Sequence, residues 1–235
     1  MTLQKLIDLS TRIVFFGGAG VSTESGIPDF RSQDGLYNTK YDYPPEQIVS
    51  HSFYKAHGEE FFRFYREKMI FPDAKPNAAH IKLAELERAG KLSCVITQNI
   101  DGLHQMAGSK NVIELHGSIH RNYCERCRKA YPLLAITECN GIPVCDCGGR
   151  IKPDVVLYEE SLNTDDLVRA GDELSQADTL IIGGTSLAVY PAAALVHQFR
   201  GDNIVVINKS PISADEYADL IIKDSIGKVL AEIEI

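Results

Sequence analysis

Short apolar segments alternate along the chain with longer amphipathic segments. The short segments are rich in β-branched residues and end at glycine or polar residues, which predicts strands at 13–16, 93–97, 112–115, 179–183, 204–207 and 220–222. The longer segments place apolar residues at helical spacing, which predicts helices at 77–90, 165–176, 188–199 and 226–233. Because the two kinds of segment alternate, we expect an α/β protein with a mostly parallel sheet covered by helices.

The first ten residues carry charges among their apolar positions. They predict an amphipathic helix with Leu3, Leu6, Ile7 and Ser10 on one face, and they do not resemble a signal peptide. The chain also lacks a run of the roughly 18 apolar residues that a membrane helix needs. We therefore expect a cytoplasmic protein that makes no contact with a membrane.

Two stretches do not follow the alternation of strands and helices. Residues 35–72 are rich in tyrosine and phenylalanine and are broken by prolines, and residues 119–151 hold five of the six cysteines. Both look like insertions that together form a smaller second domain. The main domain is then expected to consist of residues 1–34, 73–118 and 152–235.

The cysteines of the second insertion are spaced as metal ligands. Cys124 and Cys127 form one close pair, and Cys145 and Cys147 form another after an interval of 17 residues. Two thiolate pairs on two turns can complete a tetrahedron around Zn²⁺, and four thiolates leave no position open for a substrate. We therefore expect one structural zinc ion in residues 119–151. Cys139 has no close partner and is the alternative ligand, whereas Cys94 lies in a predicted strand and suits the core.

The charge balance limits the range of partners. There are 24 lysine and arginine residues against 32 aspartate and glutamate residues, which gives a formal net charge of −8 at pH 7. An acidic chain is a poor candidate for nucleic-acid binding through phosphate neutralisation, and it suits lysine-bearing partners.

Chemistry-bearing residues gather where predicted strands end. A glycine-rich stretch, Gly18–Arg31, follows the first strand, and such a turn presents backbone N–H groups to a pyrophosphate. Polar residues between Thr97 and His104 follow the second strand, at the sheet edge where ligands of α/β proteins bind. His116 follows the third strand, and its reference pKa near 6.5 suits a general base at neutral pH. Taken singly, each of these residues could equally be a cap, a turn residue or a structural histidine.

Five motifs together remove that ambiguity. They are GAGVSTESGIPDFR at 18–31, TQNIDGLH at 97–104, ELHG at 114–117, the two cysteine pairs, and GTSLAVYPA at 184–192. In this order and spacing they resemble the sirtuins, the NAD-dependent protein deacylases, over essentially the whole chain. The resemblance implies a Rossmann-like doubly wound parallel sheet with a smaller helical and zinc-binding domain. It also implies a deacetylase reaction in which acyl-lysine, NAD and water give lysine, nicotinamide and 2′-O-acyl-ADP-ribose.

The resemblance also assigns roles to individual positions. His116 matches the general base, and Asn99 accompanies it as a catalytic residue. Val156, Leu157, Tyr158 and Val189 match peptide-binding positions. NAD is expected to contact Ala19, Gly20, Thr23, Asp29, Phe30, Arg31, Gln98, Asn99, Ile100, Asp101, His116, Gly184, Thr185, Ser186, Asn208, Lys209 and Ile226.

The chain departs from the family pattern in two places. Tyr158-Glu159-Glu160 stands where many relatives have Phe-Gly-Glu, and a carboxylate at Glu159 would favour basic residues beside the target lysine. Phe62 and Tyr65 match the Tyr-x-x-Arg pair with which some relatives hold succinyl or malonyl groups. Because neither position carries a cation, we expect acetyl-lysine as the substrate; ordinary core packing is the alternative role for this pair.

Other functions remain open from the sequence. Deacylation of longer uncharged acyl groups and mono-ADP-ribosyl transfer would use the same cofactor site. A silent NAD-binding adaptor would need neither His116 nor Asn99. A zinc module that binds nucleic acid would use the small basic cluster of Arg121, Arg126, Arg128 and Lys129, but such a cluster usually forms a solvated face. We expect a monomer that acts on acyl-lysine proteins or peptides.

Overall fold

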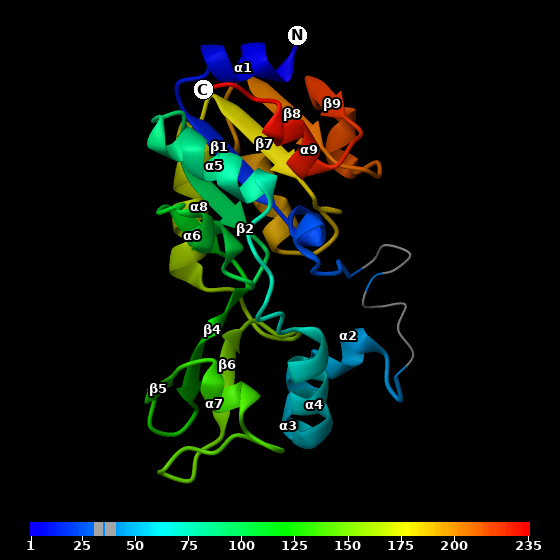
Figure 1. The fold of residues 1–235 in the computed structure, drawn as a ribbon, viewed down its shortest axis with the longest axis vertical. Coiled ribbons are helices and arrows are strands. Elements are labelled where there is room, and N and C mark those ends of the chain that lie inside the picture. The colour runs from blue at the N-terminus through cyan, green and yellow to red at the C-terminus, as the bar shows by residue number, and fades with distance from the viewer. Residues whose placement is uncertain (31–34, 36–40) are drawn as a thin grey trace.

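The molecule consists of a larger domain built on a sheet and a smaller domain that projects from one end of it (Figure 1). The computed structural model describes residues 1–30, 35 and 41–235. Among these residues, no helix has the length and apolar character required to cross a membrane.

The larger domain contains a six-stranded sheet in the order β3-β2-β1-β7-β8-β9, with every neighbouring pair parallel. The chain runs outward from β1 to β3, returns to β7 beside β1, and runs outward again to β9. This reversal between β1 and β7 is the switch point at which α/β sheets open a crevice for ligands. The strands are β1 Ile13–Gly17, β2 Leu92–Thr97, β3 Val112–Glu114, β7 Thr179–Gly183, β8 Asn203–Ile207 and β9 Leu220–Ile222.

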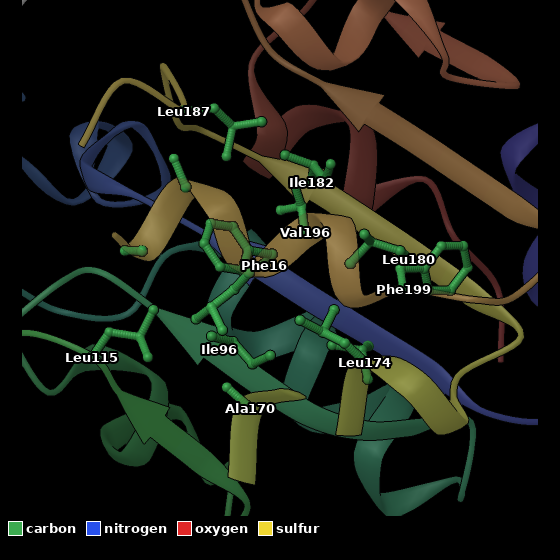
Figure 2. Packing of buried hydrophobic residues seen from close by; sticks show 14 of the residues in the cluster. Phe16, Ile96, Leu115, Ala170, Leu174, Leu180, Ile182, Leu187, Val196 and Phe199 are labelled. Atoms are coloured by element: carbon green, nitrogen blue, oxygen red, sulfur yellow. The ribbon is translucent and has the colours of Figure 1, made fainter. Parts of the chain in front are cut away.

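Residues of β1 alternate between the two faces of this sheet. Phe16 packs with Ile96 and Leu174 on the face covered by α8 (Thr164–Gln176) and the 3-10 helix η4 (Ala192–Gln198), as Figure 2 shows. Ile13 and Phe15 belong to the other apolar cluster, which includes residues of α1 (Leu3–Leu9), α5 (Ala78–Arg88) and α9 (Ile226–Ala231). Helices on both faces explain why the strands are apolar throughout and do not alternate with polar residues.

The smaller domain joins two separate stretches of the chain. One contributes α2 (Pro45–Ile48), α3 (His51–Ala56) and α4 (Gly58–Lys68). The other contributes β4 (Gly117–Cys124), β5 (Ala130–Tyr131) and α7 (Leu134–Thr137), and β4 pairs antiparallel with β5 and with β6 (Ile151–Val155). Buried aromatic residues of α3 and α4 share one apolar cluster with Ile119, Cys124 and Ile151. The expected fold class, a Rossmann-like sheet with a smaller domain made by two insertions, is therefore confirmed.

The predicted elements differ from the observed ones mainly at their ends. The six strands start and stop within one residue of their expected bounds. The helix expected at 188–199 is a 3-10 helix that begins only at Ala192. Pro191 explains this difference, because a proline disfavours the helical conformation in the residue before it. The domain boundary expected between residues 151 and 152 falls inside β6, whose partner is β4 of the small domain.

The N-terminal helix buries the face that its pattern predicts. Leu3, Leu6 and Ile7 are buried in α1. Ser10 follows the helix as its C-cap, and its hydroxyl lies 2.7 Å from the main-chain oxygen of Leu6 and 2.6 Å from the Thr179 hydroxyl. The hydroxyl of Ser10 thereby connects the helix to the first residue of β7 and is not left unpaired.

Candidate active site

A cavity of about 970 Å³ lies where the two domains meet, at the carboxyl ends of the sheet strands. Its wall includes every expected cofactor and peptide position among the described residues, and Arg31 lies outside the described residues. These positions are Ala19, Gly20, Thr23, Asp29, Phe30, Gln98, Asn99, Ile100, Asp101, His116, Val156, Leu157, Tyr158, Gly184, Thr185, Ser186, Val189, Asn208, Lys209 and Ile226. The structure therefore brings them together, while their individual roles stay predictions.

The glycine-rich turn after β1 is packed against the turn after β7. The Gly20 amide donates to the main-chain oxygen of Gly184 at 2.8 Å. A Cβ atom at Gly20 would lie 2.8 Å from both the Cα and the oxygen of Gly184, which is closer than real side chains come. Glycine is therefore needed at this position to close the switch point and leave main-chain groups facing the cavity.

Glu24 ties the same turn to the start of α9. Its carboxylate accepts the Gly227 amide at 2.7 Å, at the start of α9. The hydroxyl of Thr23 donates to the main-chain oxygen of Gly20 at 3.0 Å. The sequence analysis did not single out Glu24, because its contact is 203 residues away in the chain and no local pattern announces it.

A chain of hydrogen bonds fixes the polar residues after β2. The side-chain amide of Asn99 donates to the Ser22 hydroxyl at 3.0 Å, and that hydroxyl donates to the Asp101 carboxylate at 2.6 Å. The other carboxylate oxygen of Asp101 accepts the Leu103 amide at 2.9 Å. Ser22, which the sequence analysis missed, therefore orients both Asn99 and Asp101 toward one part of the cavity.

His116 lies two residues after the end of β3 and is held in one orientation. Its Nδ1 atom is 2.9 Å from the main-chain oxygen of Gln98. Since a carbonyl oxygen can only accept a hydrogen bond, Nδ1 carries the proton and Nε2 keeps its lone pair. Burial lowers the pKa of His116, although its hydrogen bond to Gln98 opposes that shift. The imidazole is therefore neutral at pH 7, as a general base has to be.

The expected peptide segment passes beside His116 and then contacts the small domain. The Val156 amide donates to the main-chain oxygen of His116 at 3.0 Å, and Gly117 pairs with Val155. Two residues on, the Tyr158 amide donates to the main-chain oxygen of Val49 at 3.0 Å. Residues 156–158 therefore line the cavity while both domains hold them.

The pair expected to face the acyl group is divided between two environments. Phe62 is fully buried in the aromatic cluster of the small domain and lies outside the cavity wall, as its core-packing alternative requires. Tyr65 is also buried but borders the cavity. Lys68, one helical turn further along α4, borders the cavity as well, and the sequence analysis did not consider it.

Four cysteines form a compact cluster at the tip of the small domain. The sulfur atoms of Cys124, Cys127, Cys145 and Cys147 all lie within 4.8 Å of one another, as a tetrahedral metal site requires. Cys139 is not part of this cluster, and Cys94 is buried in β2.

Neighbouring donors favour the thiolate form of Cys124 and Cys145. At Cys147 the Gly149 main-chain N–H is outweighed by hydrogen bonds with the Cys124 and Cys127 thiols, which raise the pKa of Cys147 to about 12. The Cys147 main-chain N–H and the Tyr131 hydroxyl, the latter 2.9 Å from the Cys145 sulfur, lower the pKa of Cys145 to about 6. The Cys127 amide donates to the sulfur of Cys124 at 3.4 Å. Four clustered thiols, two of which have a lowered pKa, fit a soft divalent metal ion.

A doubly wound sheet, a glycine turn at its switch point and a histidine beside an interdomain cavity define an NAD-binding type of α/β protein with a metal-binding small domain. The family model described as the Sir2 family matches residues 18–191, so the chain belongs to the Sir2 family. The resemblance to the sirtuins is thereby confirmed.

Three similar proteins show how far this relationship extends. A Clostridium acetobutylicum protein named NAD-dependent protein deacetylase is 61% identical over 98% of this chain and 96% of its own length. A solved structure of a Sir2 homologue–NAD complex is 42% identical with a TM-score of 0.88, covering 98% of this chain and 90% of that one. A solved Sir2–p53 peptide–NAD⁺ complex is 40% identical with a TM-score of 0.85, covering 98% of this chain and 96% of that one.

Proposed function

We propose that the protein is an NAD-dependent protein-lysine deacetylase that converts acetyl-lysine, NAD and water to lysine, nicotinamide and 2′-O-acetyl-ADP-ribose. The observation that carries the proposal is that the Gly18–Gly20 turn, His116 and residues 156–158 all line the same cavity. The deacetylase name of the Clostridium acetobutylicum relative and the solved complex with both p53 peptide and NAD⁺ support the same activity.

His116 acts as the general base in this proposal. Its neutral imidazole, anchored through Nδ1 to Gln98, offers the Nε2 lone pair to the cavity. From there it draws a proton through the ribose hydroxyls of the NAD substrate, which enables the ribose 2′-oxygen to take over the acyl group. A well-placed base contributes about 10²–10⁴-fold to the rate.

The NAD substrate lies along the carboxyl ends of β1, β2, β7 and β8. The main-chain groups of Ala19 and Gly20 face its phosphates, and Asn208, Lys209 and Ile226 lie by the adenosine. Asn99 and Asp101, which Ser22 orients, face the nicotinamide end. Holding the ribose and the acyl group in one aligned arrangement supplies the proximity that a weak acyl-oxygen nucleophile needs.

The acyl-lysine peptide adds to the edge formed by Val156, Leu157 and Tyr158, with Val189 on the other side of the cavity. Main-chain hydrogen bonds of this kind give affinity with little sequence selectivity.

Cys124, Cys127, Cys145 and Cys147 hold one structural zinc ion. When bound, the zinc supplies folding free energy to the tip of the small domain and takes no part in the reaction.

Mass spectrometry of an acetyl-lysine peptide, with and without NAD, tests the proposal. The expected result is NAD-dependent loss of acetyl together with formation of nicotinamide and O-acetyl-ADP-ribose in equal amounts. Nicotinamide release with ADP-ribosylated protein and intact acetyl-lysine would instead show mono-ADP-ribosyl transfer. If NAD were bound but never consumed, the protein would be a binding module and the proposal would be wrong.

A further inference from the structure

A tight turn at the end of the peptide-binding segment has an unfavourable residue at its third position. The turn comprises Leu157–Glu160 and is closed by a hydrogen bond from the Glu160 amide to the main-chain oxygen of Leu157 at 3.0 Å. Glu159 has a φ of 74°, in the left-handed region that favours glycine. A side chain with a Cβ atom is strained there, so the turn needs a compensating interaction to keep its shape.

The compensating interaction comes from the small domain. The Glu159 carboxylate accepts the Ser52 amide at 2.9 Å and the Ser52 hydroxyl at 2.7 and 2.6 Å. Ser52 is the second residue of α3, so the carboxylate also satisfies an amide that the helix itself cannot pair. These hydrogen bonds hold the pKa of Glu159 below its usual range, and the carboxylate is ionised at neutral pH.

Neighbouring groups reinforce the same attachment. The His51 amide donates to the main-chain oxygen of Tyr158 at 3.0 Å, and the His51 ring lies 2.8 Å from the Glu160 carboxylate. The other Glu160 oxygen accepts the Leu157 amide at 3.0 Å and pairs with the buried Lys152 ammonium at 3.1 Å. Residues 158–160 are therefore all bonded to the start of α3. Glu159 contributes the bonds to Ser52.

We propose that Glu159 is a positioning residue that latches the peptide-binding segment to Ser52 and so fixes the edge on which an acyl-lysine peptide docks. This inference rests on the proposed function, because it assigns the latch to the peptide side of the same site. The latch does not touch the NAD side of the cavity. Peptide affinity should therefore depend on it, whereas NAD affinity and kcat should not.

Three variants separate the latch from its alternatives. Ser52→Ala removes the hydroxyl donor and leaves the charge, Glu159→Gln removes the charge, and Glu159→Gly removes the whole side chain while relieving the backbone strain. Glu67→Gln is the matched control, because Glu67 is an exposed carboxylate on α4 outside the cavity wall. The probe is a fluorescein-labelled acetyl-lysine peptide with alanine flanks, bound in the absence of NAD and followed by fluorescence anisotropy.

Glu159→Gly is expected to raise the peptide Kd by about three- to tenfold, because it removes the hydrogen bonds to both the Ser52 amide and the Ser52 hydroxyl. Ser52→Ala should raise the peptide Kd by a smaller factor, because the amide of residue 52 still bonds the carboxylate, and the double variant should bind no worse than Glu159→Gly alone. KM for the peptide should rise in parallel, with kcat, KM for NAD and the control variant within about twofold of the unaltered protein.

Hydrogen exchange at the Ser52 amide reports the latch independently of turnover, and Glu159→Gly should speed that exchange. If Ser52 lost its protection while the peptide Kd stayed unchanged, the latch would exist without positioning anything, and the proposal would be wrong. Equal weakening of NAD and peptide binding would overturn it as well. An unaltered protein that binds the peptide but does not deacetylate it would instead contradict the proposed function alone.

Discussion

The Nδ1 atom of His116 lies 2.9 Å from the main-chain oxygen of Gln98, the residue that immediately follows β2. Two adjacent strands thus cooperate to orient one imidazole, because β3 delivers the histidine and the end of β2 selects its tautomer. Because Nδ1 donates to Gln98, Nε2 is the unprotonated nitrogen. This tautomer is the one that the proposed role of His116 as general base requires.

Replacing His116 by alanine is expected to lower the deacetylation rate by about 10²–10⁴-fold, because the proton acceptor is lost. NAD binding should stay within a few-fold of that of the unaltered protein, since the remaining wall of the cavity is intact. Single-turnover kinetics measure the first effect and calorimetric titration with NAD the second. His197→Gln, a change to an exposed histidine in η4, should alter neither. Unchanged turnover in His116→Ala would refute the assigned role.

Two buried histidines make the fold sensitive to acid. The rings of His80 and His104 pack 4.7 Å apart, and burial lowers the pKa of His80 to about 4 and that of His104 to about 3. In the unfolded chain both titrate near 6.5, so below that pH the unfolded state binds protons that the folded state excludes. The free energy of unfolding should therefore be unaffected by this pair above pH 6.5. It should fall by about 1.4 kcal/mol per pH unit per histidine from there toward pH 4.

Urea unfolding between pH 7.5 and 5 tests this pair. Among the described residues, neither ring nitrogen of His104 has a hydrogen-bond partner, so His104→Leu should cost little at neutral pH. The variant should lose stability less steeply in acid, by the contribution of one proton. If its acid slope matched that of the unaltered protein, His104 would not be the group that titrates.

Removing one cysteine of the cluster should release the metal. Cys124→Ala is expected to abolish zinc binding, unfold the tip of the small domain and stop deacetylation indirectly, because three thiolates cannot close the tetrahedron. Cys139→Ala is the matched control, since its thiol lies outside the cluster. Metal analysis by mass spectrometry, together with circular dichroism, separates the two variants. Full zinc retention in Cys124→Ala would contradict the assignment.

Charge around the peptide edge should bias substrate choice. Glu159 belongs to the cavity wall, and its carboxylate, bonded to Ser52, stays ionised at neutral pH, so it should attract cations near the docking edge. Acetyl-lysine peptides flanked by arginine should have a kcat/KM a few-fold higher than peptides flanked by aspartate, and added salt should reduce the difference. Equal rates on both peptides at low salt would exclude the bias.

Acetyl groups should be removed faster than succinyl groups. Phe62 is buried away from the cavity and Tyr65 is uncharged, so these positions offer no cation to an acyl carboxylate. Parallel assays on acetyl- and succinyl-lysine peptides measure the preference. Efficient desuccinylation would contradict it and would direct attention to Lys68, since Lys68→Met should then abolish only the succinyl activity.

Local patterns were sufficient for the sheet and for much of the cavity wall. Apolar runs such as that of β1 predict strands, and parallel strands that share a switch point bring their carboxyl ends together, so Gly20, Asn99 and His116 could be placed near one another. The contacts made by Ser22, Glu24 and Ser52 could not be predicted, because each joins residues from 77 to 203 positions apart. Such pairs depend on how finished elements pack, and a serine or glutamate in a loop carries no sign of its distant partner.

The pairing of Gly117 with Val155, next to His116 and Val156, marks the place about which the two domains would turn if they moved. Two of the segments that connect the domains, around residues 116–117 and 155–156, lie side by side at this point. In any rotation, displacement grows with distance from the axis, so a small domain turning about this pair would move Cys124, at the far end of β4, much more than Gly117 at its start. His116, which adjoins the pair, would hardly move. Such a rotation would let the cavity widen for a bulky protein substrate without moving His116, the base of the proposed mechanism.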